Sequence, residues 1–94
     1  MTVAHEQERH RFVVSEPDGR GELVYTPHGP GVIDLLHTEV APSLRGRGVG
    51  DALAKAALDY ARRNGIKVIV TCPFVKKWLA RHPEQGDVVI DRPR

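Results

Sequence analysis

The chain has 94 residues, of which 40% are hydrophobic and 28% charged, and its formal net charge at pH 7 is +2 with histidines neutral. This length favours one domain with one small core, and the composition is ordinary for a globular protein. The 14 lysines and arginines form no run of five or more. That distribution argues against a broad nucleic-acid footprint, which needs a basic stripe or patch.

The first part of the chain predicts a flexible terminus followed by a β-hairpin. Residues 1–9 are polar, so we expect them to be frayed, with a single domain over residues 10–94. His10–Val14 and Glu22–Thr26 are rich in β-branched and aromatic residues, and the glycines and proline of residues 17–21 signal a turn between them. These two strands are therefore expected to pair.

A longer third strand is expected over Val32–Val40. Strict alternation along a strand would place Ile33, Leu35, His37 and Glu39 on one face. Polar residues gather near the end of this segment on both faces. We therefore expect this end of the strand to border a functional site.

The second half of the chain predicts helix, strand and helix. Apolar residues recur at helical spacing over residues 49–63, and the pair Asn64-Gly65 signals the helix end. Lys67–Thr71 fits a buried parallel strand, Pro73 can open a second helix, and residues 87–90 form a last edge strand or an apolar tail. The expected fold is a mixed α/β (α+β) fold with a mostly antiparallel central sheet, a βαβ unit and two main helices.

The loop before the first helix carries alternating glycines and two arginines, in the order Arg45-Gly46-Arg47-Gly48-Val49-Gly50. Glycines let a backbone approach a ligand closely, and a helix start favours an anion, so this loop suits a pyrophosphate. A P-loop would need Lys and then Ser or Thr after its last glycine, but Asp51 and Ala52 follow here. A dinucleotide fold would place its glycines after the first strand of a parallel unit. A tight connection without a ligand remains an alternative.

The same loop resembles the Arg/Gln-x-x-Gly-x-Gly/Ala acetyl-coenzyme A signature of the GNAT acetyltransferase superfamily. The flanking segments His37–Val40, Ala57–Ala61, Thr71–Val75 and Arg81–Glu84 extend the likeness to the small, stand-alone GNAT-like (YjdJ-type) N-acetyltransferase domain. The resemblance covers about residues 10 to 90.

This resemblance implies a compact GNAT-like fold and transfer of an acetyl group from acetyl-CoA to an amine of a small molecule or protein. It implies that backbone groups of Thr38 and Val40 pair with the pantetheine arm. The pyrophosphate would be held by the loop and the first helical residues, which are Arg45, Gly46, Arg47, Gly48, Val49, Gly50, Asp51 and Ala52.

Two departures from the family pattern support an alternative function. The chain lacks most of the N-terminal helices that build an acceptor site in larger GNAT enzymes. The tyrosine that often acts as general acid has no clear counterpart, and Trp78 stands in the region where relatives often carry it. The alternative is therefore a non-catalytic CoA-binding or protein-interaction module of the same fold.

Three side chains are candidates for the chemistry. Cys72 precedes Pro73 at a predicted helix start and could take up the acetyl group as a nucleophile, or could be a buried small hydrophobe. Glu39 and His37 could accept a proton from an acceptor amine, or could be polar residues at a solvated strand end. No spacing of histidines with one another or with Cys72 suits a metal ion, so no metal is expected.

The expected partners are acetyl-CoA and an unidentified amine acceptor, with the protein a monomer or weak dimer. The lone cysteine cannot form an internal disulfide, which favours a reducing, cytoplasmic setting. No membrane association is expected, because no segment approaches the roughly 20 apolar residues that span a bilayer, and residues 1–11 do not look like a signal peptide. Nucleic-acid binding through the basic loop is a weaker hypothesis that salt-dependent binding would revive.

Overall fold

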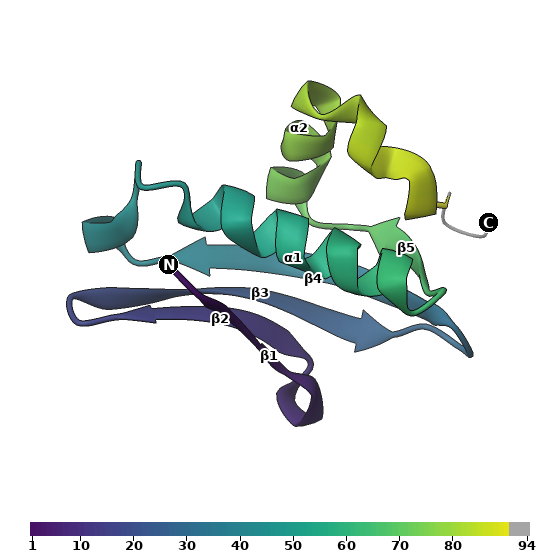
Figure 1. The fold of residues 1–94 in the computed structure, drawn as a ribbon, viewed down its shortest axis with the longest axis horizontal. Coiled ribbons are helices and arrows are strands. Elements are labelled where there is room, and N and C mark those ends of the chain that lie inside the picture. The colour runs from purple at the N-terminus through teal and green to yellow at the C-terminus, as the bar shows by residue number, and fades with distance from the viewer. Residues whose placement is uncertain (91–94) are drawn as a thin grey trace.

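Five strands form one sheet in chain order, and the computed structural model describes residues 1–90 of the chain (Figure 1). The strands are β1 Val3–Glu6, β2 Arg11–Glu16, β3 Gly19–Pro27, β4 Val32–Val40 and β5 Lys67–Val70. The first four strands pair antiparallel with their neighbours, whereas β5 runs parallel to β4. The predicted mixed fold with a mostly antiparallel sheet and a βαβ unit is confirmed.

Two α-helices follow, α1 over Val49–Arg63 and α2 over Pro73–Arg81. Three short 3-10 helices cover Gln7–Arg9, Pro42–Leu44 and Pro83–Val88. Helix α1 lies across one face of the sheet, and α2 and the last 3-10 helix pack beside α1 on the β5 side (Figure 1). Within residues 1–90, neither α-helix is long and apolar enough to cross a membrane.

The core lies between the sheet and α1. Its largest fully buried side chains include Leu23 and Leu35 from the sheet and Leu53 and Leu58 from α1. Leu53 and Ala57, which share one stripe at helical spacing, are buried, and Tyr60 packs against the same cluster from its edge. This packing fixes α1 and therefore the position of the glycine-rich loop at its N-terminus.

The N-terminal segment differs from the sequence expectation. The polar composition predicts a flexible segment over residues 1–9, but Val3–Glu6 forms β1, paired with β2. A 3-10 turn and the left-handed backbone of His10, with φ 52°, reverse the chain so that β1 can pair. This strand is not evident from the polar composition, because most residues of the segment face water and only a few, such as Val3 and His5, turn toward the core. The other terminus is a partial match, because the expected last strand is reduced to a bridge between Val68 and Val89.

A β-bulge interrupts the pairing of β3 with β4. Val24 lies opposite His37, but the next residue, Tyr25, lies opposite Leu35. Leu36 is therefore an extra residue on β4. Such a residue shifts every later side chain of the strand to the other face.

The bulge corrects the face assignment predicted from strict alternation. Thr38 and Val40, and not His37 and Glu39, share the helix-covered face with Leu35. His37 and Glu39 lie on the opposite face and are exposed. The expectation that these two share a face with each other holds, but their face is the one without α1.

The aromatic cluster of His5, Phe12 and Tyr25 holds β1 on the sheet, and we expect it to make the stability of the protein depend on pH. The His5 ring stacks on Phe12 with centroids 4.2 Å apart, and its Nε2 lies 2.6 Å from the Tyr25 hydroxyl. Burial lowers the pKa of His5 below 6.5. The unfolded chain thus binds this proton more readily, so the contribution is complete above pH 6.5 and is lost as pH falls toward the folded-state pKa.

We expect the free energy of urea unfolding to fall from pH 7 to pH 5, and to fall less in His5→Gln. The control is His28→Gln, because His28 is exposed in the β3–β4 turn. In this variant the free energy of unfolding should change with pH as it does in the wild type. Equal slopes for wild type and His5→Gln would contradict the assignment.

Candidate functional site

Strands β4 and β5 separate halfway along β4. Their register ends with Leu35 opposite Val70, and the N–H groups of Thr71 and Cys72 then both donate to the Leu35 carbonyl at 3.0 and 2.9 Å. Helix α2 begins at the next residue and leaves the sheet. Among the described residues, the segment 36–40 therefore has a strand neighbour on only one side.

The backbone groups of Thr38 and Val40 point into the opening between the strands. The Ala41 N–H donates to the Arg20 carbonyl at 3.0 Å, which makes this a hydrogen-bonded pair of β3 and β4. Hydrogen-bonded and non-hydrogen-bonded pairs alternate along an antiparallel ladder, so Thr38 and Val40 occupy non-hydrogen-bonded pairs. Their N–H and C=O groups face away from β3 and can pair with an extended ligand.

The glycine-rich loop meets this opening at the start of α1. Gly46 and Gly48 have φ values of 80° and 78°, which is the left-handed region that glycine adopts without strain. Gly48 is the N-cap of α1, and no side-chain hydrogen bond caps the helix. The N–H groups of the first turn, which begins at Val49, are therefore available to an anion.

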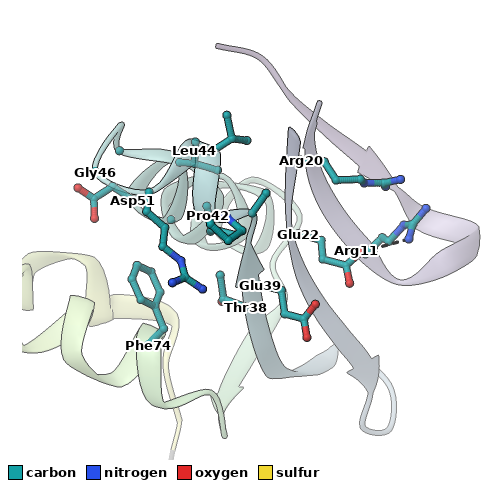
Figure 2. A pocket seen from close by; sticks show the side chains of 16 residues that line it. Arg11, Arg20, Glu22, Thr38, Glu39, Pro42, Leu44, Gly46, Asp51 and Phe74 are labelled. Atoms are coloured by element: carbon teal, nitrogen blue, oxygen red, sulfur yellow. Dashed lines mark hydrogen bonds and ion pairs between the residues drawn. The ribbon is translucent and has the colours of Figure 1, made fainter. Parts of the chain in front are cut away.

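Phe74 of α2 forms the opposite wall. A Cβ atom on Gly50 would lie 2.4 Å from Cζ of Phe74, so only glycine lets the ring pack this closely on α1. Figure 2 shows Phe74 and Thr38 on the same side of β4, facing the loop. The ring thus closes the space between the two helices.

A cavity of about 1030 Å³ joins these parts and continues around the free edge of β4. On the helix side it is lined by Thr38, Val40, Phe74 and most of the loop between Ala41 and Asp51. On the other side its lining residues are charged, namely Arg11, Arg20, Glu22 and Glu39. Figure 2 shows these four side chains on the side of β3 and β4 away from α1.

Ion pairs organise part of the charged wall. Arg11 pairs with Glu6, and its Nη1 donates to Glu22 at 3.2 Å. The hydrogen bond from the Arg11 guanidinium holds the pKa of Glu6 below its usual range. Glu22 and Glu39 are direct register partners, a pairing of like charges that destabilises a sheet unless a cation compensates.

The structure brings most of the predicted site residues together. Those that line the cavity are Thr38, Glu39, Val40, Arg45, Gly46, Gly48, Val49, Gly50 and Asp51. Four do not line it, namely Arg47, Ala52, His37 and Cys72. Arg47 turns its side chain to Asp18, with Nη2 3.0 Å from Oδ2, Ala52 lies one residue further along α1, and His37 is exposed beyond the cavity.

Cys72 lies behind the cavity wall. The residue is 1% exposed, and its Sγ lies 3.4 Å from Oγ1 of Thr38. Thr38 lines the cavity and Cys72 does not. The thiol is therefore one layer removed from any ligand in this conformation.

Sequence reasoning missed Phe74 and the charged residues of β2 and β3, which are Arg11, Arg20 and Glu22. The charged residues of β2 and β3 can be identified from the strand register, which sets Glu22 beside Glu39. This register becomes readable only once the hairpin pairing and the bulge are known.

Comparisons with known proteins agree on one family. The sequence profile described as GCN5-related N-acetyl-transferase matches residues 11–88. Protein NATD1 of Gallus gallus and of Homo sapiens are each 37% identical over 85 residues, covering 88% of this chain and 77% and 75% of theirs. The solution structure of a GCN5-like protein from Staphylococcus aureus matches with a TM-score of 0.72 and 27% identity, covering 99% of this chain and 91% of that one.

Proposed function

The chain belongs to the GCN5-related N-acetyltransferase family, and we propose that it transfers an acetyl group from acetyl-CoA to an amine. The observation that carries the proposal is the continuous cavity from the α1 N-terminus, along the unpaired edge of β4, to the free carboxylate of Glu39. One end suits a pyrophosphate, the middle suits an extended arm, and the far end offers a base.

The residues present fit acetyl-CoA. Backbone groups of Thr38 and Val40 would pair with the pantetheine arm, and first-turn N–H groups of α1 with Arg45 would hold the pyrophosphate. Asp51 would contribute its backbone N–H, because its carboxylate repels phosphate. When bound, acetyl-CoA supplies an acetyl group activated as a thioester.

The chain itself contributes two things to transfer, namely a proton acceptor and the unpaired edge of β4, which would position the pantetheine arm. As the amine nitrogen bonds to the acetyl carbon, the carbon–sulfur bond breaks and the electron pair leaves with the CoA sulfur. The proton released from the nitrogen passes to Glu39, which lies on the cavity wall opposite the loop. Glu39 is favoured over His37 because His37 does not line the cavity.

The test combines acetyl-CoA binding by calorimetry with acceptor-dependent release of free CoA over an amine panel. Saturable binding with amine-dependent release supports the transferase. Binding without release from any amine would favour the non-catalytic CoA-binding module. Absence of binding would contradict both functions.

The two loop arginines are expected to differ in their effect on cofactor affinity. Arg45 lines the cavity, whereas the Arg47 side chain is engaged with Asp18. One exposed charge-assisted contact to phosphate is worth on the order of 1.4 kcal/mol, so Arg45→Gln should raise the Kd for acetyl-CoA about tenfold. Arg47→Gln should raise it less than about threefold by the same conversion. Equal effects in calorimetry would contradict this division.

Direct attack by the amine is favoured over a route through Cys72, because the thiol is buried behind Thr38. We expect Cys72→Ala to keep kcat within about threefold of wild type, a change below about 1 kcal/mol in the barrier. Intact-mass measurement after incubation with acetyl-CoA alone should show no acetylated protein. An acetyl-cysteine, together with loss of activity in Cys72→Ala, would establish the other route.

A further inference from the structure

The charged half of the cavity carries information about the acceptor. The loop, the β4 edge and Phe74 line the half assigned to acetyl-CoA, so the acceptor must enter from the face of the sheet opposite α1. Among the described residues, those that line the cavity there are all charged and come from β2, β3 and β4 (Figure 2). Their pairing decides which charges are left to meet a substrate.

Arg11 is committed to the protein. It pairs with Glu6 and reaches Glu22, so one guanidinium is shared by two carboxylates. The negative charge of Glu22, which lies beside Glu39, is therefore only partly compensated. Arg11 has no free charge for an anionic substrate.

Arg20 and Glu39 are the two charged residues of this wall that are available to a substrate. Both are exposed, and within residues 1–90 neither side chain makes an ion pair or hydrogen bond, although the charge of Arg20 helps to lower the pKa of Glu6 after the larger effect of Arg11. Arg20 lies opposite Ala41 and two residues along β3 from Glu22, which puts the Cα atoms of Arg20 and Glu22 roughly 7 Å apart on one face. The cavity thus presents, side by side, a carboxylate pair and a guanidinium that has no hydrogen bond or ion pair within residues 1–90.

We propose, resting on the transferase function, that the acceptor is an amine that also carries a carboxylate, a compound of the amino-acid class. Its ammonium group would lie at Glu39 and Glu22, and its carboxylate at Arg20, whose planar fork matches a carboxylate in a bidentate pair. A phosphate is disfavoured because its second negative charge would lie beside the two glutamates. The ammonium gives one proton to solvent before attack, and the second passes to Glu39 as the amide forms.

The experiment compares acceptors that differ only in the carboxylate. β-Alanine is paired with n-propylamine, and γ-aminobutyrate with n-butylamine, because each pair has the same chain length and similar basicity. Common α-amino acids complete the panel. We expect the wild-type kcat/KM for CoA release to be at least about tenfold higher for the carboxylated member of each pair.

Variants assign the preference to Arg20. Arg20→Gln should bring the ratio within each pair close to one, and Arg20→Lys should retain part of it, since lysine keeps the charge without the fork. Arg9→Gln is the matched control, because Arg9 is exposed and lies outside the cavity, and it should keep the wild-type ratio. A wild-type ratio near one, or a ratio that survives Arg20→Gln, would overturn the proposal.

A binding readout separates this proposal from the proposed function. The Nε–H resonance of Arg20, followed by NMR in the presence of CoA, should shift on titration with β-alanine and not with n-propylamine. If no amine releases CoA yet this shift occurs, the transferase function is wrong, and the cavity binds a carboxylated amine at Arg20 without acetylating it. If transfer occurs to amines but Arg20 does not respond to β-alanine, the acceptor class is wrong and transfer stands.

Discussion

Glu39→Gln should lower kcat by about 10²- to 10³-fold while leaving the affinity for acetyl-CoA unchanged, since a positioned general base typically contributes 10²- to 10⁴-fold. Glutamine keeps the size of the side chain but cannot accept the proton from the amine. Glu39 is exposed on a paired strand, so this substitution is not expected to disturb the core. Steady-state kinetics with a saturating acceptor measure kcat, and calorimetry measures acetyl-CoA affinity.

Glu8→Gln is the control for this variant. Glu8 is exposed in the first 3-10 helix, outside the cavity, and its removal changes net charge by the same amount. Its kcat should match wild type. A Glu39→Gln enzyme with wild-type kcat would exclude the carboxylate as the base, whereas a loss of acetyl-CoA affinity would indicate a role in cofactor binding.

Gly48→Val should weaken acetyl-CoA binding at least about tenfold, equivalent to about 1.4 kcal/mol. Gly48 has φ 78° at the N-cap of α1 and lines the cavity. A β-branched residue at this backbone conformation costs about 1–3 kcal/mol, so the loop would change shape to relieve it. The rearranged loop no longer aims its N–H groups at one point, and the added side chain projects into the space meant for the ligand.

The chain offers a matched control for backbone strain. Gly29 in the β3–β4 turn has φ 82°, and a Cβ atom added to either Gly29 or Gly48 would meet no other part of the protein within 4 Å. Gly29 does not line the cavity. Gly29→Val should therefore lose similar stability in thermal unfolding but keep acetyl-CoA affinity. Equal losses of affinity in both variants would show that general destabilisation, and not the loop, explains the effect.

Local signals are sufficient for the elements that build the cofactor side. The predicted bounds of β4, Val32–Val40, and α1, Val49–Arg63, coincide with the structure. Both segments carry strong hydrophobic patterns and are bounded by glycine or proline. The loop between them is a local feature of contiguous residues, so its chemistry can be read directly.

Features that depend on pairing between distant segments could not be predicted in this way. The extra residue Leu36 in β4 changes which face Thr38 and Glu39 occupy, and no local pattern announces a bulge. The burial of Cys72 behind Thr38 depends on where β5 leaves the sheet. The polar N-terminus forms β1 because β2 offers it an edge, and this tertiary context overrides its weak strand propensity.

An NMR titration of the isotope-labelled protein with acetyl-CoA tests the central claim most directly. We predict saturable shifts that are largest for the amides of residues 46–52 and for Thr38 and Val40, which belong to the loop, the helix start and the unpaired β4 edge. Within this range the N–H groups of Arg47 and Ala52 bond to the Leu44 and Gly48 carbonyls, so the amides between Gly48 and Asp51 should shift most. Amides of β1, which lies at the far edge of the sheet, should change little. Absence of saturable shifts, or shifts centred on β1 and β2 instead of the loop, would contradict acetyl-CoA binding at this site.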